Sequence, residues 1–153
     1  MGRVDADEAR ARFAAARVAR LATVTPDGAP HLVPVVFAVV DDVVWSAVDD
    51  KPKSTRALRR LANIAAHPRA SLLVDHYVDD WTRLWWVRAD GRARVLDAAD
   101  PATRAGRDAL VDRYPQYAER PPGGPFVAVT VDAWRGWSAG PELVGGARGH
   151  TTS

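Results

Sequence analysis

The chain contains no cysteine, which excludes disulfides, thiolate catalysis and cysteine-ligated metal centres. Histidine is also sparse, and His31, His67, His76 and His150 are scattered without the spacings that ligate a metal ion. No apolar run approaches the roughly 20 residues that a membrane span needs, and the first residues form no apolar signal core. We therefore expect a cytoplasmic protein that has no metal centre and does not enter a membrane.

Excess charge of one sign is also lacking, because the net charge is only +2. Such a small value does not by itself imply nucleic-acid binding. Lysine is nearly absent: of 21 basic residues only Lys51 and Lys53 are lysines, and they flank Pro52. This clustering suggests a local need for positive charge. Length and an apolar content of 47% predict a single domain over residues 1–153, with flexible ends at 1–7 and 145–153.

Hydrophobic periodicity predicts a mainly β chain with peripheral helices. Helices are expected at 5–17, 54–66 and 101–113, strands at 18–25, 31–40, 43–48, 69–76, 83–96 and 126–132, and a loop at 114–125. Gly91 suggests a bulge in its strand. In the second helix, Ala57, Leu58, Leu61, Ile64 and Ala65 should face the core, with Arg56, Arg59, Arg60 and Asn63 on the other side. Strands at hairpin spacing favour an antiparallel barrel over a doubly wound sheet.

The segment from Lys51 to Arg56 is the first candidate site. It precedes a predicted helix, Ser54 is a suitable N-cap, and free backbone N–H groups at a helix start bind phosphate. Residues 51–60 hold five basic residues and no acidic one. We interpret the segment as an anion site; the alternative is a solvated basic helix face.

Two predicted strands, 31–40 and 83–87, carry apolar residues on both faces. Both faces must then be covered, by a helix, a ligand or a second subunit, and a homodimer is the economical explanation. Pro34 cannot donate to a β-ladder, so we expect it at a sheet edge or a bulge.

Tryptophan is frequent, with six in the chain. Trp81, Trp85 and Trp86 lie close together in sequence and are suited to stacking on a flat ligand; Trp81 and Trp85 are the favoured pocket positions. For each of them, ordinary packing is the alternative. No nucleophile elbow, P-loop or dinucleotide fingerprint is present, so a cofactor is expected to supply the chemistry.

Three stretches carry a resemblance to a known family: PHLVPVVFAVVDDVVWSAVDDKPK, LANIAAHPRASLLVD and LWWVRADGRARV. Together they resemble the pyridoxamine-phosphate-oxidase-like split-barrel flavoproteins, and within these they look most like the actinobacterial F420-dependent oxidoreductases. The similarity covers roughly residues 8–140.

The resemblance implies an FMN-binding-like split β-barrel of six or more antiparallel strands, and a homodimer with two cofactor sites at its interface. The cofactor phosphate would be held by Lys51, Lys53, Ser54, Thr55 and either Arg56 or Arg60. The ring would lie along Pro34, Val35, Val36 and Ser46, and the partner subunit would close the pocket with Trp81, Trp85 or Trp86. The implied activity is hydride transfer from reduced coenzyme F420 to an unsaturated or conjugated small molecule.

Other functions stay open. The same fold is compatible with flavin mononucleotide (FMN) in an oxidase or reductase. Because no acid or base stands out, a non-catalytic binder of F420, flavin or haem is a further alternative. Nucleic-acid binding is the least favoured, since the basic run is short.

Overall fold

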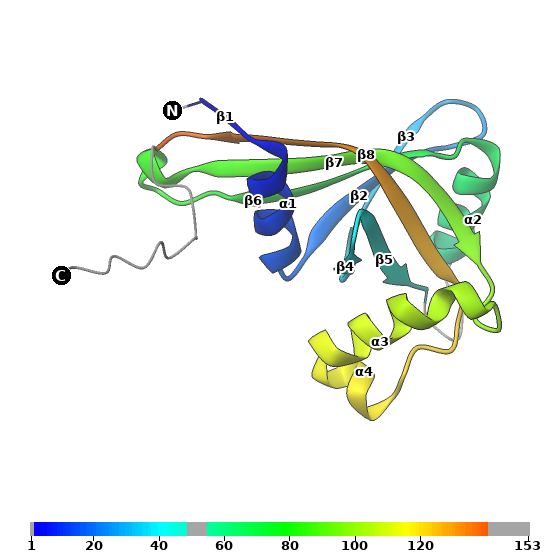
Figure 1. Cartoon of the computed structure of the whole chain (residues 1–153). Helices are drawn as coiled ribbons and strands as arrows, with labels where there is room; N and C mark the ends of the chain where they lie inside the picture. Colours follow the sequence, from blue (N-terminus) through cyan, green and yellow to red (C-terminus); the bar gives the residue numbers. More distant parts are fainter. Residues whose placement is uncertain (1, 49–54, 141–153) are drawn as a thin grey trace.

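The computed structural model describes residues 2–48 and 55–140 (Figure 1). For residues 55–58 it describes the backbone only. The elements are β1 (Gly2–Val4), α1 (Ala6–Ala15), β2 (Ala19–Val24), β3 (Pro30–Val35), β4 (Ala38–Val40), β5 (Val43–Ala47), α2 (Thr55–Ala66), β6 (Arg69–His76), η1 (Trp81–Arg83), β7 (Trp85–Leu96), η2 (Pro101–Thr103), α3 (Arg104–Arg113), α4 (Pro115–Glu119) and β8 (Phe126–Ser138). Within these residues, no helix has the length and apolarity needed to cross a membrane.

The strands form one antiparallel sheet in the order β3-β2-β6-β7-β8-β5-β4, with β1 added beside β8. Its two end strands, β3 and β4, are joined in sequence by residues 36–37 alone. The sheet must therefore curl back on itself, yet no ladder joins β3 to β4 within the described ranges. This arrangement is the predicted split β-barrel, and Pro34 lies on an edge strand, as expected.

The predicted strand 31–40 is interrupted at Val36 and Phe37, where neither flanking ladder continues. The hydroxyl of Tyr114 replaces the missing partners. It accepts a hydrogen bond from the Phe37 N–H at 3.1 Å and lies 2.8 Å from the Phe37 carbonyl oxygen and 2.9 Å from that of Arg17. The break next to Val36 is thus satisfied by a residue at the end of α3.

Two apolar clusters hold the fold together. Alternate strand residues fill the barrel interior, where α1 adds Ala9 and Phe13 and α2 adds Ile64. The second cluster lies outside the barrel, where α3 and α4 cover β4, β5 and the start of β8 (Figure 1). In this cluster Trp45 and Phe126 meet edge to face, with ring centroids 6.4 Å apart.

Several local predictions differ from the structure. Residues 2–4, expected to be flexible, form β1, and the expected loop at 114–125 contains α4. Asn63, placed on the solvent side of its helix, is fully buried because its amide donates to the Thr23 hydroxyl at 3.1 Å, whereas Ala65 is exposed. The bulge at Gly91 is confirmed by a register shift in the β7–β8 ladder, where a Cβ atom would lie 2.1 Å from the Thr130 carbonyl oxygen.

Candidate functional site

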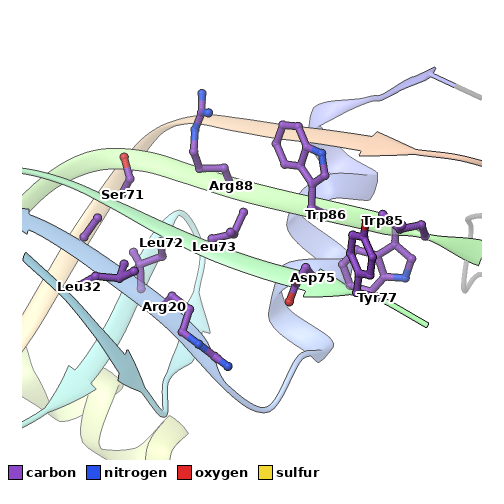
Figure 2. A pocket seen from close by; sticks show the side chains of 12 residues that line it. Arg20, Leu32, Ser71, Leu72, Leu73, Asp75, Tyr77, Trp85, Trp86 and Arg88 are labelled. Carbon is purple, nitrogen blue, oxygen red and sulfur yellow. The ribbon is translucent and has the colours of Figure 1, made fainter. Parts of the chain in front are cut away.

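The outer face of β3, β2, β6 and β7 carries a groove of about 480 Å³ (Figure 2). Its lining residues are Arg20, Ala22, Leu32, Ser71, Leu72, Leu73, Asp75, Tyr77, Leu84, Trp85, Trp86 and Arg88. The helices α3 and α4, which cover the outer face of β4 and β5, do not contribute to this lining. Among the residues that the structure describes, the groove is therefore an uncovered part of the sheet.

Strand register explains which side chains reach the groove. The ladders pair Arg20 with Pro34 and Leu73, and Leu73 in turn with Arg88. Because successive strand residues point to opposite faces, this cross-strand row faces outward while the adjacent row faces the barrel core. The inward row contains Leu21 and Leu72, which are almost completely buried.

Apolar side chains form much of the groove surface. Leu32 is 67% exposed and Leu73 is 38% exposed, although both are large aliphatic residues. Trp86 is half-buried on the same face, and Tyr77 is exposed at the groove's end. A contiguous apolar surface of this kind marks a site for a ligand or for another chain.

Two arginines of this outer face pair with a single carboxylate, that of Asp90. Its carboxylate accepts hydrogen bonds from the Ser71 hydroxyl at 2.7 Å and from the Arg88 guanidinium at 2.9 Å. Arg135 Nε lies 3.4 Å from its second oxygen. One carboxylate thus neutralises two arginines, whereas the guanidinium of Arg20 forms no hydrogen bond or ion pair with any residue that the structure describes.

The residues predicted to contact the cofactor ring divide into two groups. Pro34 is exposed on β3 beside Arg20, and Val36 is half-buried at the strand break. Val35 points inward and is 7% exposed, and Ser46 is buried between Val44 and Val48 of the interior core. The structure therefore brings Pro34 next to the groove but leaves Val35 and Ser46 inside the barrel.

The three neighbouring tryptophans have different surroundings. Trp86 faces the groove from β7. Trp85 also lines it, but its ring stacks on His76 at 6.1 Å and lies under the Arg12 guanidinium at 5.2 Å. Trp81 is 70% exposed on η1 and is not part of the lining. Trp86, which was not a favoured pocket position, thus has the most direct access to the groove.

Most of the predicted anion site lies outside the described residues. This applies to Lys51, Lys53 and Ser54, and Thr55 and Arg56 are described only as the first residues of α2.

Arg60, on the same helix, is half-buried, and its Nε atom has no hydrogen-bond partner within the described ranges. Burial lowers the pKa of its guanidinium, an effect that the nearby Tyr117 partly opposes. Because arginine remains protonated, Arg60 presents a partly desolvated positive charge with one unused donor.

Sequence reasoning missed Arg20, Asp75 and Arg88 as groove residues. The signal for Arg20 was the alternation of strand 18–25, which places it on the face opposite Ala19 and Leu21. Its apolar neighbour Leu73 comes from a strand 53 positions later, and only the β2–β6 register reveals that they meet.

The comparisons with known proteins agree with the split-barrel fold. The family model of pyridoxamine 5'-phosphate oxidase matches residues 6–138, whereas no curated protein matches the chain.

Three solved structures illustrate the shared fold. A conserved hypothetical protein of Mycobacterium tuberculosis is 24% identical, with a TM-score of 0.71, and the match covers 89% of this chain and 86% of that one. A FAD-binding protein of Mesorhizobium loti is 23% identical, with a TM-score of 0.68 and coverage of 88% and 95%. A haem-binding protein of Mycobacterium smegmatis is 23% identical, with a TM-score of 0.69 and coverage of 90% and 55%. The split barrel and the family match over residues 6–138 together show that the chain belongs to the pyridoxamine 5'-phosphate oxidase family.

Proposed function

We propose that the protein is a homodimeric, F420-dependent oxidoreductase that reduces an unsaturated or conjugated small molecule. The observation that carries this proposal is the uncovered apolar groove beside Pro34, on a barrel of a family that includes flavin-dependent oxidases. A flat ring system can lie on such a surface, while charged groups elsewhere hold its polar tail.

The residues present fit an anionic cofactor. Arg60 offers an unpartnered, partly buried donor, and a buried cation of this kind is costly unless a negative group pairs with it. The sequence places four more basic residues within positions 51–60 and no acid. F420 carries a phosphodiester and a polyglutamate tail, whereas FMN carries a single phosphate. The concentration of positive charge therefore favours F420.

The groove's exposed leucines support the homodimer. Leu32 and Leu73 present aliphatic surface to solvent in the single chain, and a second copy would close over the groove and bury this surface together with the ligand that lies on it. Trp81, exposed at the end of the same sheet, would be available to the partner's site. Sedimentation velocity at micromolar concentration should give the mass of two chains, and a monomer across the accessible concentrations would contradict this part of the proposal.

Reduced F420, if bound here, would supply hydride chemistry. The chain's own residues would bind and orient the cofactor and the substrate, and they would exclude water from the site. Arg60 and the basic residues before it would hold the negative tail. The apolar surface of Leu32, Leu73 and Trp86 would exclude water from the ring and hold the conjugated substrate against it.

A cofactor titration tests the proposal directly. Purified protein is titrated with F420 and, separately, with FMN while tryptophan fluorescence is followed. We expect micromolar binding of F420 and weaker binding of FMN. Tight FMN binding with no response to F420 would reject the cofactor assignment.

An Arg60→Gln variant sharpens the same experiment. A charge-assisted hydrogen bond is worth about 1.5–3 kcal/mol, so F420 binding should weaken by about ten- to a hundredfold. Arg94→Gln is the matched control, because Arg94 is an exposed arginine on β7 outside the groove. If both variants bind F420 as tightly as the wild type, the basic residues of this helix form a solvated surface and not a cofactor site.

FMN is the alternative cofactor. Similar structures include FAD-binding proteins from Mesorhizobium loti and Mycobacterium smegmatis, which supports a flavin in this fold. Protein that is yellow when purified, with a flavin absorption spectrum, would favour this alternative.

A further inference from the structure

We propose that Arg20 is the anion-recognition residue of the groove, so that the substrate is a conjugated molecule carrying a negative charge. The inference rests on the proposed function in one respect, which is that the bound anion is called a substrate. The recognition itself follows from charge and position on the outer face of the sheet.

The first argument is a charge imbalance within one cross-strand row. The row runs from Arg20 through Leu73 to Arg88 and Arg135. Asp90 binds both Arg88 and Arg135, at 2.9 and 3.4 Å. Arg20 is the arginine of this row for which the described residues supply no bound carboxylate.

Asp75 is the acidic residue among those that line the groove and needs separate consideration. It is exposed two residues beyond Leu73 on β6, and no ion pair joins it to Arg20 in the described part of the chain. Figure 2 shows Arg20 and Arg88 extending in opposite directions, with Leu73 between them. Asp90, the carboxylate that neutralises Arg88, likewise forms no ion pair with Arg20 among the described residues.

The second argument is the apolar setting of this cation. Pro34 and Leu73 are its direct cross-strand neighbours, and Leu32 lines the groove on the adjacent strand. Apolar walls reduce the local dielectric once a ligand displaces water, which strengthens a charge-assisted hydrogen bond. The guanidinium fork matches a carboxylate or sulfonate in two parallel bonds.

These features define one ligand chemistry. A planar apolar body would lie over Leu32, Leu73 and Trp86, and an anionic group would reach Arg20. A neutral molecule of the same shape would gain the apolar contacts but leave Arg20 unpaired. The difference between a charged and an uncharged probe therefore isolates the role of Arg20.

The experiment uses two fluorescent probes that share an anilinonaphthalene-type body. The first is 8-anilinonaphthalene-1-sulfonate, which carries a sulfonate, and the second is the uncharged N-phenyl-1-naphthylamine. Both are titrated into the full-length wild type, Arg20→Gln and Arg94→Gln. We expect Arg20→Gln to weaken binding of the sulfonate probe about tenfold and to change that of the neutral probe less than twofold. Arg94→Gln should leave both affinities unchanged.

Three results would overturn the inference. The first is an equal effect of Arg20→Gln on both probes, or no effect on either. The second is an equal loss of affinity for the sulfonate probe in Arg94→Gln, which would indicate that the protein's overall positive charge attracts this probe. The third is a fall in sedimenting mass for Arg20→Gln, since Arg20 would then serve contact with a second copy. Because neither probe is a redox cofactor, a failed F420 titration would not produce any of these results.

Discussion

Replacing Gly106 with alanine tests whether α3 is fixed against the barrel by one close contact. A Cβ atom at this position would lie 2.2, 2.5 and 2.6 Å from three atoms of the Trp45 ring. Ordinary contact begins near 3.4 Å, so the ring or the helix must move by more than about 1 Å. Trp45 is 4% exposed and its strand is paired on both sides, which leaves little room for that movement.

Two effects of opposite sign decide the outcome of Gly106→Ala. Alanine favours a helix interior over glycine by about 1 kcal/mol, while overpacking a filled core costs about 1–3 kcal/mol. Because the contact is with a constrained aromatic ring, overpacking should prevail. For this rigid contact the overpacking cost should lie at the upper end of its range, about 2–3 kcal/mol. We therefore expect a net loss of about 1–2 kcal/mol in the free energy of unfolding, and a fall in Tm of roughly 3–6 °C.

Denaturant unfolding monitored by circular dichroism gives the required free energy. Ala105→Gly, at the exposed neighbouring position of α3, measures the helix-propensity contribution in the same helix. If Gly106→Ala is as stable as the wild type, or more stable, the Trp45 contact does not fix the helix and the reasoning fails.

Two further predictions concern buried and exposed polar groups. Asn63→Leu alone should cost about 1–3 kcal/mol, because it leaves the buried Thr23 hydroxyl unpaired. The double variant Thr23→Val/Asn63→Leu replaces both partners and should recover most of that loss; a double variant less stable than the single one would contradict this account. Asp80 accepts hydrogen bonds from the Thr82 N–H and hydroxyl, and these bonds hold the pKa of its carboxyl below the ordinary value. The stabilisation is therefore present above the unfolded-state pKa and is lost as the pH falls through the lower folded-state pKa. Asp80→Ala should abolish the amide-exchange protection of Thr82 at neutral pH, and unchanged protection would show that the cap is unimportant.

The sequence specified most strands because alternation directly reports a half-buried sheet. Strand 69–76 was predicted with the observed bounds, and the barrel class followed from hairpin spacing. The errors arose where a distant residue decides the local structure. Tyr114 satisfies the backbone of Phe37, 77 positions away, and thereby permits the break between β3 and β4. No periodicity within 31–40 contains that information.

The candidate site was predictable only in part, for the same reason. An excess of apolar residues on both faces of 31–40 predicted an apolar outer face, which the structure shows at the exposed Leu32, but not which neighbours share that face. Asn63 shows the converse error, because a polar side chain was assigned to solvent although its partner lies within the barrel. Cross-strand register decides the first case, and the packing of α2 against β2 decides the second. The sequence displays neither.

Trp45 and Trp86 show why similar strand patterns lead to different surroundings. The helices α3 and α4 belong to the connection between β7 and β8, and Leu96 at the end of β7 pairs with Phe126 at the start of β8. The connection therefore covers that end of the sheet, including Trp45. Trp86 lies ten residues from Leu96 along β7, or about 30 Å at the rise of an extended strand. The connection packs over β4, β5 and the start of β8 and contributes no residue to the groove lining, so the described residues leave the outer face around Trp86 uncovered.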